Sequence, residues 1–303
     1  MIQHLSTAAI GAPITRLGVS FFPVYLPSND PPEIRTGTSS GIVVRELDNA
    51  EVGSLLAVNP TDTPILIVDG EHFLGGKQNR AVNASVLVPA RAERTMPVSC
   101  LEQGRWGQAQ SYERDVVNAS PRIRRVIQEG VYDSIQREQT HASDQGRVWS
   151  EIADELQSHQ AQSSTSAATE SHREIYRRDK ARAVAARELS ELGPLPGQCG
   201  IAVSQGRWIT AVEIFGARHL LAEHWGALIK SHLMEHTVHT GPPSADIALW
   251  VIRRFASMAS QEAPGVGLGT DLRLRDKKRI GQALTYEESL VHGSFWMRQA
   301  KAA

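Results

Sequence analysis

The stretch GIAVSQGRWITAVEIF, residues 200–215, decides how the chain folds. β-branched and apolar residues fill 200–204 and 207–215, and Gln205-Gly206 between them is typical of a tight turn, so the stretch predicts a β-hairpin. A breaker, Gly193-Pro194-Leu195-Pro196-Gly197, precedes it and separates it from a long helical region. A strand pattern therefore returns in the last third of the chain.

The first third of the chain carries the same strand-like pattern. Short β-branched or apolar runs, separated by turn residues, occupy 14–26, 42–46, 55–58, 64–68, 85–88 and 95–100. Asn59-Pro60-Thr61-Asp62 predicts a hairpin turn between two of these runs, and 271–296 predicts further strands around Asp276-Lys277-Lys278. Because short strands lie at both ends of the chain, we expect an antiparallel, sandwich-like sheet built from both ends.

The middle of the chain has helical periodicity. Ser120 followed by Pro121 is typical of a helix start, a second helix is expected after Ser143, and 170–192 predicts one charged, solvated helix. Two amphipathic helices, at 220–238 and at 244–258, should cover the sheet. We therefore predict an α+β chain with a β-rich part at 1–118, a helical segment at 119–192 inserted or docked beside the sheet, and an α+β part at 193–303 that completes the domain.

Composition excludes several classes of protein. With 303 residues, 41% hydrophobic and 21% charged, the chain is not disordered as a whole, and no apolar run approaches the roughly 18 residues of a membrane span. A formal net charge of −1 offers no general attraction for nucleic acid. Two cysteines form no disulfide framework, and the N-terminal residues do not resemble a signal peptide. We expect a cytoplasmic protein with neither nucleic acid nor membrane as partner.

A dense polar cluster at 70–80 directly follows the apolar run Ile65-Leu66-Ile67-Val68. Gly75-Gly76 would let backbone amides approach a ligand, and nearby cations could meet an anion. The spacing is not that of a phosphate-binding P-loop, and an ordinary loop with solvated charges is the alternative interpretation. The candidates from this cluster are Glu71 for acid–base chemistry and Gln78, Asn79 and Arg80 for ligand binding.

A second polar cluster ends the run at 95–100. Cys100 is a candidate nucleophile if its surroundings lower the pKa of its thiol; otherwise it is a small buried apolar residue. Glu102 is a further candidate for catalysis. Arg105 and Trp106 could hold a planar or phosphorylated ligand by charge and stacking, or they could pack in the core.

Only one pattern suggests a metal site. His232-Leu233-Met234-Glu235-His236 matches the H-x-x-E-H pattern of inverted zinc peptidases on an expected helix. No convincing third ligand follows, and His232 continues an apolar stripe, so a histidine packed beside the core explains it better. We expect no metal site, and the sequence specifies no cofactor.

The two polar clusters together resemble a known family. GEHFLGGKQNRAVNASVLVPA (70–90) followed by MPVSCLEQGRW (96–106) is similar to the signature of the ARG and Rhodanese-Phosphatase-superfamily-associated domain. The resemblance extends to 212–216, the helix around Trp225 and the strand at 290–292. It implies a role near ADP-ribosylglycohydrolases, from which the family takes part of its name, and hence the handling of ADP-ribose or related nucleotides. It implies no particular reaction, and the signature residues keep open roles.

Two functions are therefore open. The first is an enzyme or nucleotide-handling protein that binds a small anionic, ADP-ribose-like ligand with the loops after Val68 and Cys100. The second is a non-catalytic interaction or scaffold module in which the same loops contact a protein partner and 170–192 forms part of the interface. Convergence of Glu71, Cys100 and Glu102 in one pocket would favour chemistry, whereas side chains that point into separate cores would favour the interaction module.

Overall fold

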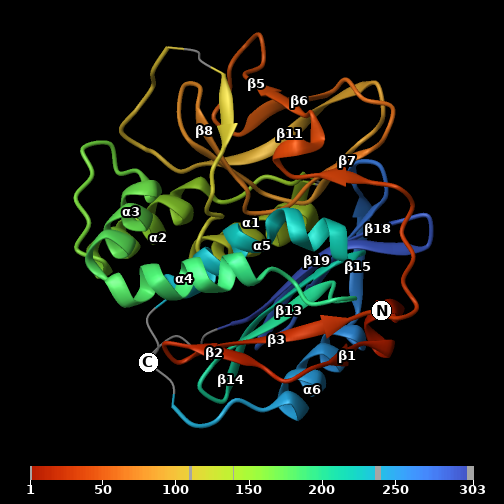
Figure 1. Ribbon diagram of the computed structural model, residues 1–303. Helices are drawn as coiled ribbons and strands as arrows, with labels where there is room; N and C mark the ends of the chain where they lie inside the picture. Colours follow the sequence, from red (N-terminus) through yellow and green to blue (C-terminus); the bar gives the residue numbers. More distant parts are fainter. Residues whose placement is uncertain (1, 109–110, 139, 236–239, 299–303) are drawn as a thin grey trace.

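Both ends of the chain contribute strands to one large antiparallel sheet. The computed structural model describes residues 2–108, 111–138, 140–235 and 240–298. Across the sheet the strands are β1 (Ala9–Ile10), β3 (Val19–Tyr25), β13 (Gly200–Gln205), β14 (Trp208–Phe215), β19 (Ser289–Met297), β18 (Arg279–Tyr286), β17 (Thr270–Arg275) and β15 (Ser260–Pro264), with β2 (Ile14–Arg16) also paired to β3. Figure 1 shows β3 beside β13, and the hairpin predicted at 200–215 is the antiparallel pair of β13 and β14. The α+β, sandwich-like fold class is confirmed.

Two smaller sheets lie above the large one in Figure 1. One contains β12 (Tyr112–Arg114), β8 (His72–Gly75), β9 (Arg80–Val82), β11 (Ala92–Cys100), β6 (Ser54–Asn59) and β5 (Val43–Arg45). The other contains β16 (Val266–Gly267), β10 (Val86–Val88), β7 (Ile65–Ile67) and β4 (Arg35–Thr36), and its two outer pairings are parallel.

The hairpin predicted at 59–62 is wrong, because β6 and β7 belong to different sheets. Asn59 does build the turn, since its side chain accepts a hydrogen bond from the Thr61 amide at 2.9 Å. Its amide group also donates to the carbonyls of Val88 and Pro89, at 3.2 and 2.9 Å. These bonds fasten the turn to the end of β10 while the chain crosses to the other sheet.

Six helices and two short 3₁₀ turns complete the described fold. They are α1 (Pro121–Glu138), α2 (Gln145–Ser158), α3 (Ala168–Arg178), α4 (Lys180–Leu192), α5 (Arg218–Leu233), α6 (Ala245–Ala256), η1 (Gln3–Thr7) and η2 (Thr38–Ser40). The single helix predicted at 170–192 is two helices. Asp179 has an extended backbone between them, and its carboxylate caps α4 by accepting from the Arg182 amide at 2.9 Å. A capping aspartate thus starts a new helix within a pattern that reads as continuous.

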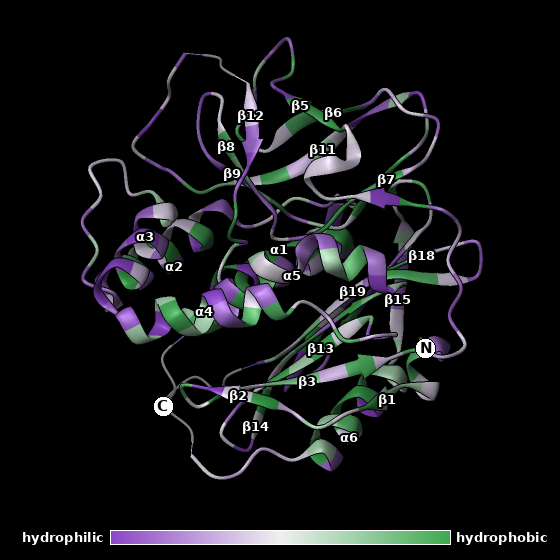
Figure 2. Cartoon of the chain, in the orientation of Figure 1, coloured by the Kyte–Doolittle hydropathy of each residue, from purple (hydrophilic) through white to green (hydrophobic). Residues whose placement is uncertain are grey.

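Alternating residues of the large sheet face two apolar layers. Phe21, Val203 and Trp296 pack with α4 and α5, whereas Phe22 and Phe295 pack with α6 on the other face. Figure 1 shows the same arrangement, with α1, α4 and α5 on one side of the sheet and α6 on the other. Figure 2 shows hydrophilic and hydrophobic stretches side by side along α4, which covers the core through Ala185, Ala186 and Leu189.

A buried ionic cluster joins α1 to two sheets. Arg124 on α1 pairs with Asp69, which follows β7, at 3.2 Å, and with Glu213 on β14 through both guanidinium Nη atoms. Gln128 on α1 and Gln282 on β18 donate to the two oxygens of Asp69, at 3.0 and 2.7 Å. The side chains of Arg124 and Glu213 are fully buried. Strands far apart in the chain are therefore held by one guanidinium.

None of the described helices combines the length and apolar character that crossing a membrane requires.

Candidate functional site

The two signature loops lie together where β9 and β11 pair. The two strands run antiparallel, with Cys100 opposite Arg80. The Gln78 side chain links the loops, because its Oε1 accepts from Arg80 Nη1 at 2.8 Å and its Nε2 donates to the Glu102 carbonyl at 3.2 Å. The structure therefore brings Gln78, Arg80, Cys100 and Glu102 into one cluster.

Arg105 closes this cluster as a clamp. Its Nε donates to the Glu102 carboxylate at 2.7 Å, and its Nη2 donates to Asn79 Oδ1 at 3.1 Å. Its two Nη atoms also donate to the carbonyls of Gly76 and Gly75. Trp106 is 52% exposed, with Lys77 Nζ 5.1 Å from its ring centre. The Nε, Nη1 and Nη2 atoms of Arg105 therefore all donate hydrogen bonds to groups of the protein itself.

Cys100 and Arg80 are both shut away from solvent. Cys100 is fully buried, and burial raises the pKa of its thiol, which opposes formation of the nucleophilic thiolate. Arg80 is also fully buried, and its Nε and Nη2 have no hydrogen-bond partner among the described residues. The cluster therefore offers a substrate no accessible thiolate, and the guanidinium of Arg80 is out of its reach.

Glu71 belongs to a different group of side chains. Its Oε1 accepts from the Val68 amide at 2.8 Å, its Oε2 pairs with Arg114 Nη1 at 3.2 Å, and its Oε1 lies 3.7 Å from His224 Nδ1. Burial raises the pKa of Glu71, although the charge of Arg114 opposes the shift. Among the described side chains, Glu71 forms no hydrogen bond or ion pair with Cys100 or Glu102, so the three candidates for catalysis do not converge in one pocket.

The signature cluster determines where α3 begins. Glu102 Oε1 accepts from the Thr165 hydroxyl at 2.8 Å, the Gly104 amide donates to the Thr165 carbonyl at 2.8 Å, and the Ala168 amide donates to the Leu101 carbonyl at 3.0 Å. Backbone and side-chain bonds thus attach residues 165–168 to the loop after β11. The helix that follows carries its side chains into an adjoining pocket.

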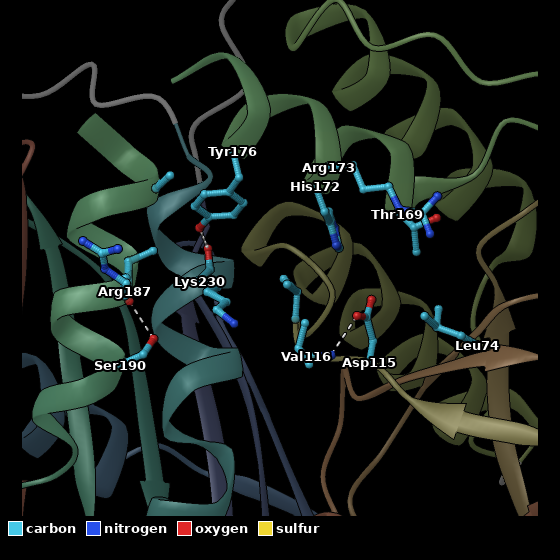
Figure 3. Close-up of a pocket in the computed structure, with 13 residues that line it drawn as sticks. Leu74, Asp115, Val116, Thr169, His172, Arg173, Tyr176, Arg187, Ser190 and Lys230 are labelled. Carbon is cyan, nitrogen blue, oxygen red and sulfur yellow. Dashed lines mark hydrogen bonds between the residues drawn. The ribbon is translucent and has the colours of Figure 1, made fainter. Parts of the chain in front are cut away.

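This pocket has a volume of about 490 Å³ and is bounded by α3, α4, α5, β8 and the residues after β12. Figure 3 shows its lining in two groups, with Tyr176, Arg187, Ser190 and Lys230 on one side and Leu74, Asp115, Thr169 and His172 on the other. The remaining lining residues are Val116, Val117, Arg173, Ala183 and Ala186. None of the eight candidates from the sequence is among them.

A compact polar group stands at one wall of the pocket. His72 on β8, Asp115 after β12 and His172 on α3 place one nitrogen or carboxylate oxygen each within 4.8 Å of one another. The two imidazole rings are stacked at 5.1 Å with planes only 2° apart, and His72 Nδ1 lies 3.4 Å from Asp115 Oδ2. These residue types at these distances are a donor set that a transition-metal ion accepts.

The charge states of this group follow from its burial. Burial, reinforced by repulsion from His72, lowers the pKa of His172 to about 3, so its ring is neutral at physiological pH. Burial alone would raise the pKa of Asp115, but the hydrogen bond and charge of His72 hold it below the ordinary value. The group therefore presents a carboxylate beside a neutral imidazole.

Positive side chains reach the pocket from three helices. Arg173 on α3 pairs with Glu170 and is largely exposed. Arg187 on α4 and Lys230 on α5 form no ion pair with any described side chain. Two cations without counter-charges at an apolar pocket favour an anionic ligand.

Sequence reasoning missed this pocket because its polar residues are far apart in the chain. His72 lay within the quoted polar cluster without a role, and no local spacing relates it to Asp115 or His172. For the H-x-x-E-H pattern, the structure agrees with the interpretation of His232 as a histidine packed beside the core. His232 is a buried histidine 3.4 Å from Glu213 and stacked on Trp296, and His236 lies outside the described residues.

Comparison with known proteins identifies a family. Searches of curated proteins and of solved structures found no match. The family model described as the ARG and Rhodanese-Phosphatase-superfamily-associated Protein domain matches residues 7–296. That range covers nearly all strands and every helix described above except η1, whose first residues precede it. The chain therefore belongs to the ARG and Rhodanese-Phosphatase-superfamily-associated Protein domain family.

Proposed function

We propose that the chain binds a small anionic ligand of the ADP-ribose or nucleotide class in the pocket between α3, α4 and α5. The observation that carries the proposal is the pair Arg187 and Lys230, which line a cavity of about 490 Å³ without an ion pair to any described side chain. A cavity of 300–1,000 Å³ with apolar walls and few polar groups is typical of small-molecule sites.

The apolar part of the pocket suits a flat, uncharged portion of such a ligand. Val116, Val117 and Leu74 line one part, and Tyr176 lines another. Tyr176 donates its hydroxyl hydrogen to the Lys230 carbonyl, which fixes the phenol ring against α5. A nucleotide combines a planar base with phosphate charge, and the family's association with ADP-ribosylglycohydrolases supports the same class.

In this proposal the signature residues position the pocket. Glu102 and Arg105 hold the loop to which residues 165–168 are attached, and this attachment sets the first turn of α3. The proposal covers binding and assigns no chemical step to Glu71, Cys100 or Glu102. Both cysteines are free, which supports our expectation of a cytoplasmic protein. A net charge of −1 supports the expectation that neither nucleic acid nor a membrane is the partner.

The test is ligand binding by the purified full chain. We expect ADP-ribose, or failing that NAD or ADP, to raise the melting temperature and to bind in titration calorimetry, whereas adenosine binds much more weakly. Lys230→Met should weaken binding by roughly 10- to 100-fold, as expected for one charge-assisted hydrogen bond. Arg91→Gln removes an exposed arginine that pairs with Asp62 and is not part of the pocket lining; it is the control and should leave affinity unchanged.

Two results would contradict the proposal: no anion shifts the melting temperature, or Lys230→Met binds as tightly as the wild type. The non-catalytic interaction module would then be the better candidate. One observation favours that second function, because α4 carries two exposed apolar side chains, Val184 and Leu192, which are 43% and 53% exposed.

A further inference from the structure

We propose that His72, Asp115 and His172 bind a divalent transition-metal ion at the wall of the pocket. This inference goes beyond ligand binding and stands on its own residues, since Arg187 and Lys230 take no part in it. Three side chains from β8, the segment after β12 and α3 converge on one point, although they are separated by 43 and 57 positions in the chain.

The distances suit coordination. Metal–nitrogen bonds of 2.0–2.1 Å in a tetrahedral zinc site place neighbouring ligand atoms about 3.3 Å apart. His72 Nδ1 and Asp115 Oδ2 already lie 3.4 Å apart, and the ligand atoms of all three residues lie within 4.8 Å of one another. A side-chain rotation of His172 on its helix would bring the third ligand to the same spacing.

The hydrogen bonding of the two histidines is incomplete without a further partner. His72 Nε2 and both ring nitrogens of His172 are buried and have no hydrogen-bond partner among the described residues. The side chain of His72 is fully buried and that of His172 is 4% exposed. Buried polar atoms are normally satisfied, because leaving one unpaired is costly. A metal ion coordinated by one nitrogen of His172 would give that buried ring the partner it lacks.

Neighbouring groups hold the donors in place. The Val116 amide donates to Asp115 Oδ1 at 2.7 Å, which leaves Oδ2 facing His72. Behind His172, Glu155 Oε1 lies 4.0 Å from its Nε2, while Ser120 donates to the other oxygen of Glu155. A carboxylate at this position can accept the N–H of the imidazole when His172 binds a metal through Nδ1, as second-shell carboxylates do in zinc sites.

The donor types indicate the class of metal. Two imidazoles and one carboxylate suit Zn²⁺ in an open site and also Fe²⁺, whereas Mg²⁺ and Ca²⁺ prefer oxygen ligands. Asp115 and His172 line the pocket, so coordination positions not filled by protein face the space where an anionic ligand would lie. A phosphate oxygen or a water molecule could complete the coordination there.

The experiment measures metal binding by the full chain with no organic ligand present. After removal of metals with a chelator and dialysis, Zn²⁺ is titrated in competition with a chromophoric chelator, with Fe²⁺ under anaerobic conditions and Mg²⁺ as further arms. We expect one Zn²⁺ or Fe²⁺ per chain and no competition from Mg²⁺. His172→Asn and Asp115→Asn should each lower the affinity by more than about 100-fold, since loss of a second-shell partner alone costs 10- to 100-fold.

His141→Asn is the matched control. Like His72, His141 pairs with a carboxylate, and its Nε2 lies 2.8 Å from Asp271 Oδ2. This contact involves one histidine and one aspartate, whereas the proposed metal site has two histidines and one aspartate. It should bind metal like the wild type. Circular dichroism checks that the variants fold. If His172→Asn does not fold, Asp115→Asn decides, because Asp115 is the most exposed of the three.

Sub-stoichiometric binding by the wild type, or wild-type affinity in a folded Asp115→Asn or His172→Asn protein, would overturn the proposal. Failure of the proposed function is distinguishable, because ADP-ribose binding is measured separately with and without Zn²⁺. If Zn²⁺ binds but no anion does under either condition, the metal site stands and the ligand proposal falls. If the anion binds but no metal does, the reverse holds.

Discussion

Replacing Arg124 by leucine tests the buried ionic cluster that joins α1 to two sheets. The guanidinium pairs with Asp69 and Glu213, and all three side chains are at most 2% exposed. Burial on its own would raise the pKa of both carboxyls, but the charge of Arg124 holds both pKa values below their ordinary range. Arg124→Leu would therefore leave two buried carboxylates without their counter-charge.

The expected cost follows from measured cases of broken buried pairs. Removing one partner of such a pair costs about 3–5 kcal/mol, because the remaining charge has lost both water and its partner. With an unfolding entropy of about 2.1 cal/mol/K per residue, a chain of this length has roughly 0.6 kcal/mol/K, so the melting temperature should fall by roughly 5–8 °C. The exposed pair of Arg91 and Asp62 provides the control, and Arg91→Leu should leave the melting temperature nearly unchanged.

The pH dependence sharpens this test. In the wild type, depressed carboxyl pKa values contribute stability that is present above the unfolded pKa values and is lost as the pH falls through the folded ones. In Arg124→Leu the same carboxyls are buried without a cation, so their folded pKa values rise and the variant gains stability relative to the wild type between pH 7 and pH 5. Scanning calorimetry at both pH values measures this. A deficit of the same size at both would refute the reasoning.

Two further predictions concern the two cysteines and Arg80. Burial raises the pKa of both thiols, that of Cys199 to about 11. We therefore expect neither cysteine to react with an aromatic disulfide reagent in the native protein and both to react after unfolding. Rapid labelling of Cys100 in the native protein would contradict its burial. Arg80→Lys should lose the bond to Gln78 and lower the melting temperature by roughly 3 °C, for a cost of about 2 kcal/mol, while ADP-ribose affinity measured by calorimetry stays within about twofold. A fall in affinity at an unchanged melting temperature would instead place Arg80 in the ligand site.

Local patterns predicted the elements whose signals are themselves local. Ser244 caps α6 by accepting from the Ile247 amide, as its position before an amphipathic run indicated. The same reasoning failed to predict the break at Asp179. The residues on both sides of Asp179 favour helix, and only its capping geometry ends α3 and starts α4. The partner of β7 could not be predicted either, since an Asn59 turn looks the same whether the next strand pairs back or crosses to another sheet.

The candidate site also has one part that local sequence signals identify and one part that they do not. The resemblance located the family and the signature cluster, whose residues hold one another and the start of α3. The residues that line the pocket have no local signature: Asp115 follows a three-residue strand, and His172 lies in a helix whose pattern reads as solvated. Their meeting with His72 is a property of the packed chain, so it emerges only when β8, β12 and α3 are in place.

The position of β3 inside the large sheet has a consequence for how the chain is made. Val24 on β3 pairs with Gly200 on β13. During synthesis, β3 therefore has no β13 to pair with until some 175 further residues have been added to the chain. At about 5–20 residues per second the wait lasts roughly 9–35 s, during which an apolar strand has an open edge. The sheet is then completed only when β19, near the end of the chain, has emerged to pair with β14. We therefore expect slow folding and a dependence on chaperones that hold nascent strands, and ribosome-bound chains ending before residue 200 should be digested by protease throughout β3.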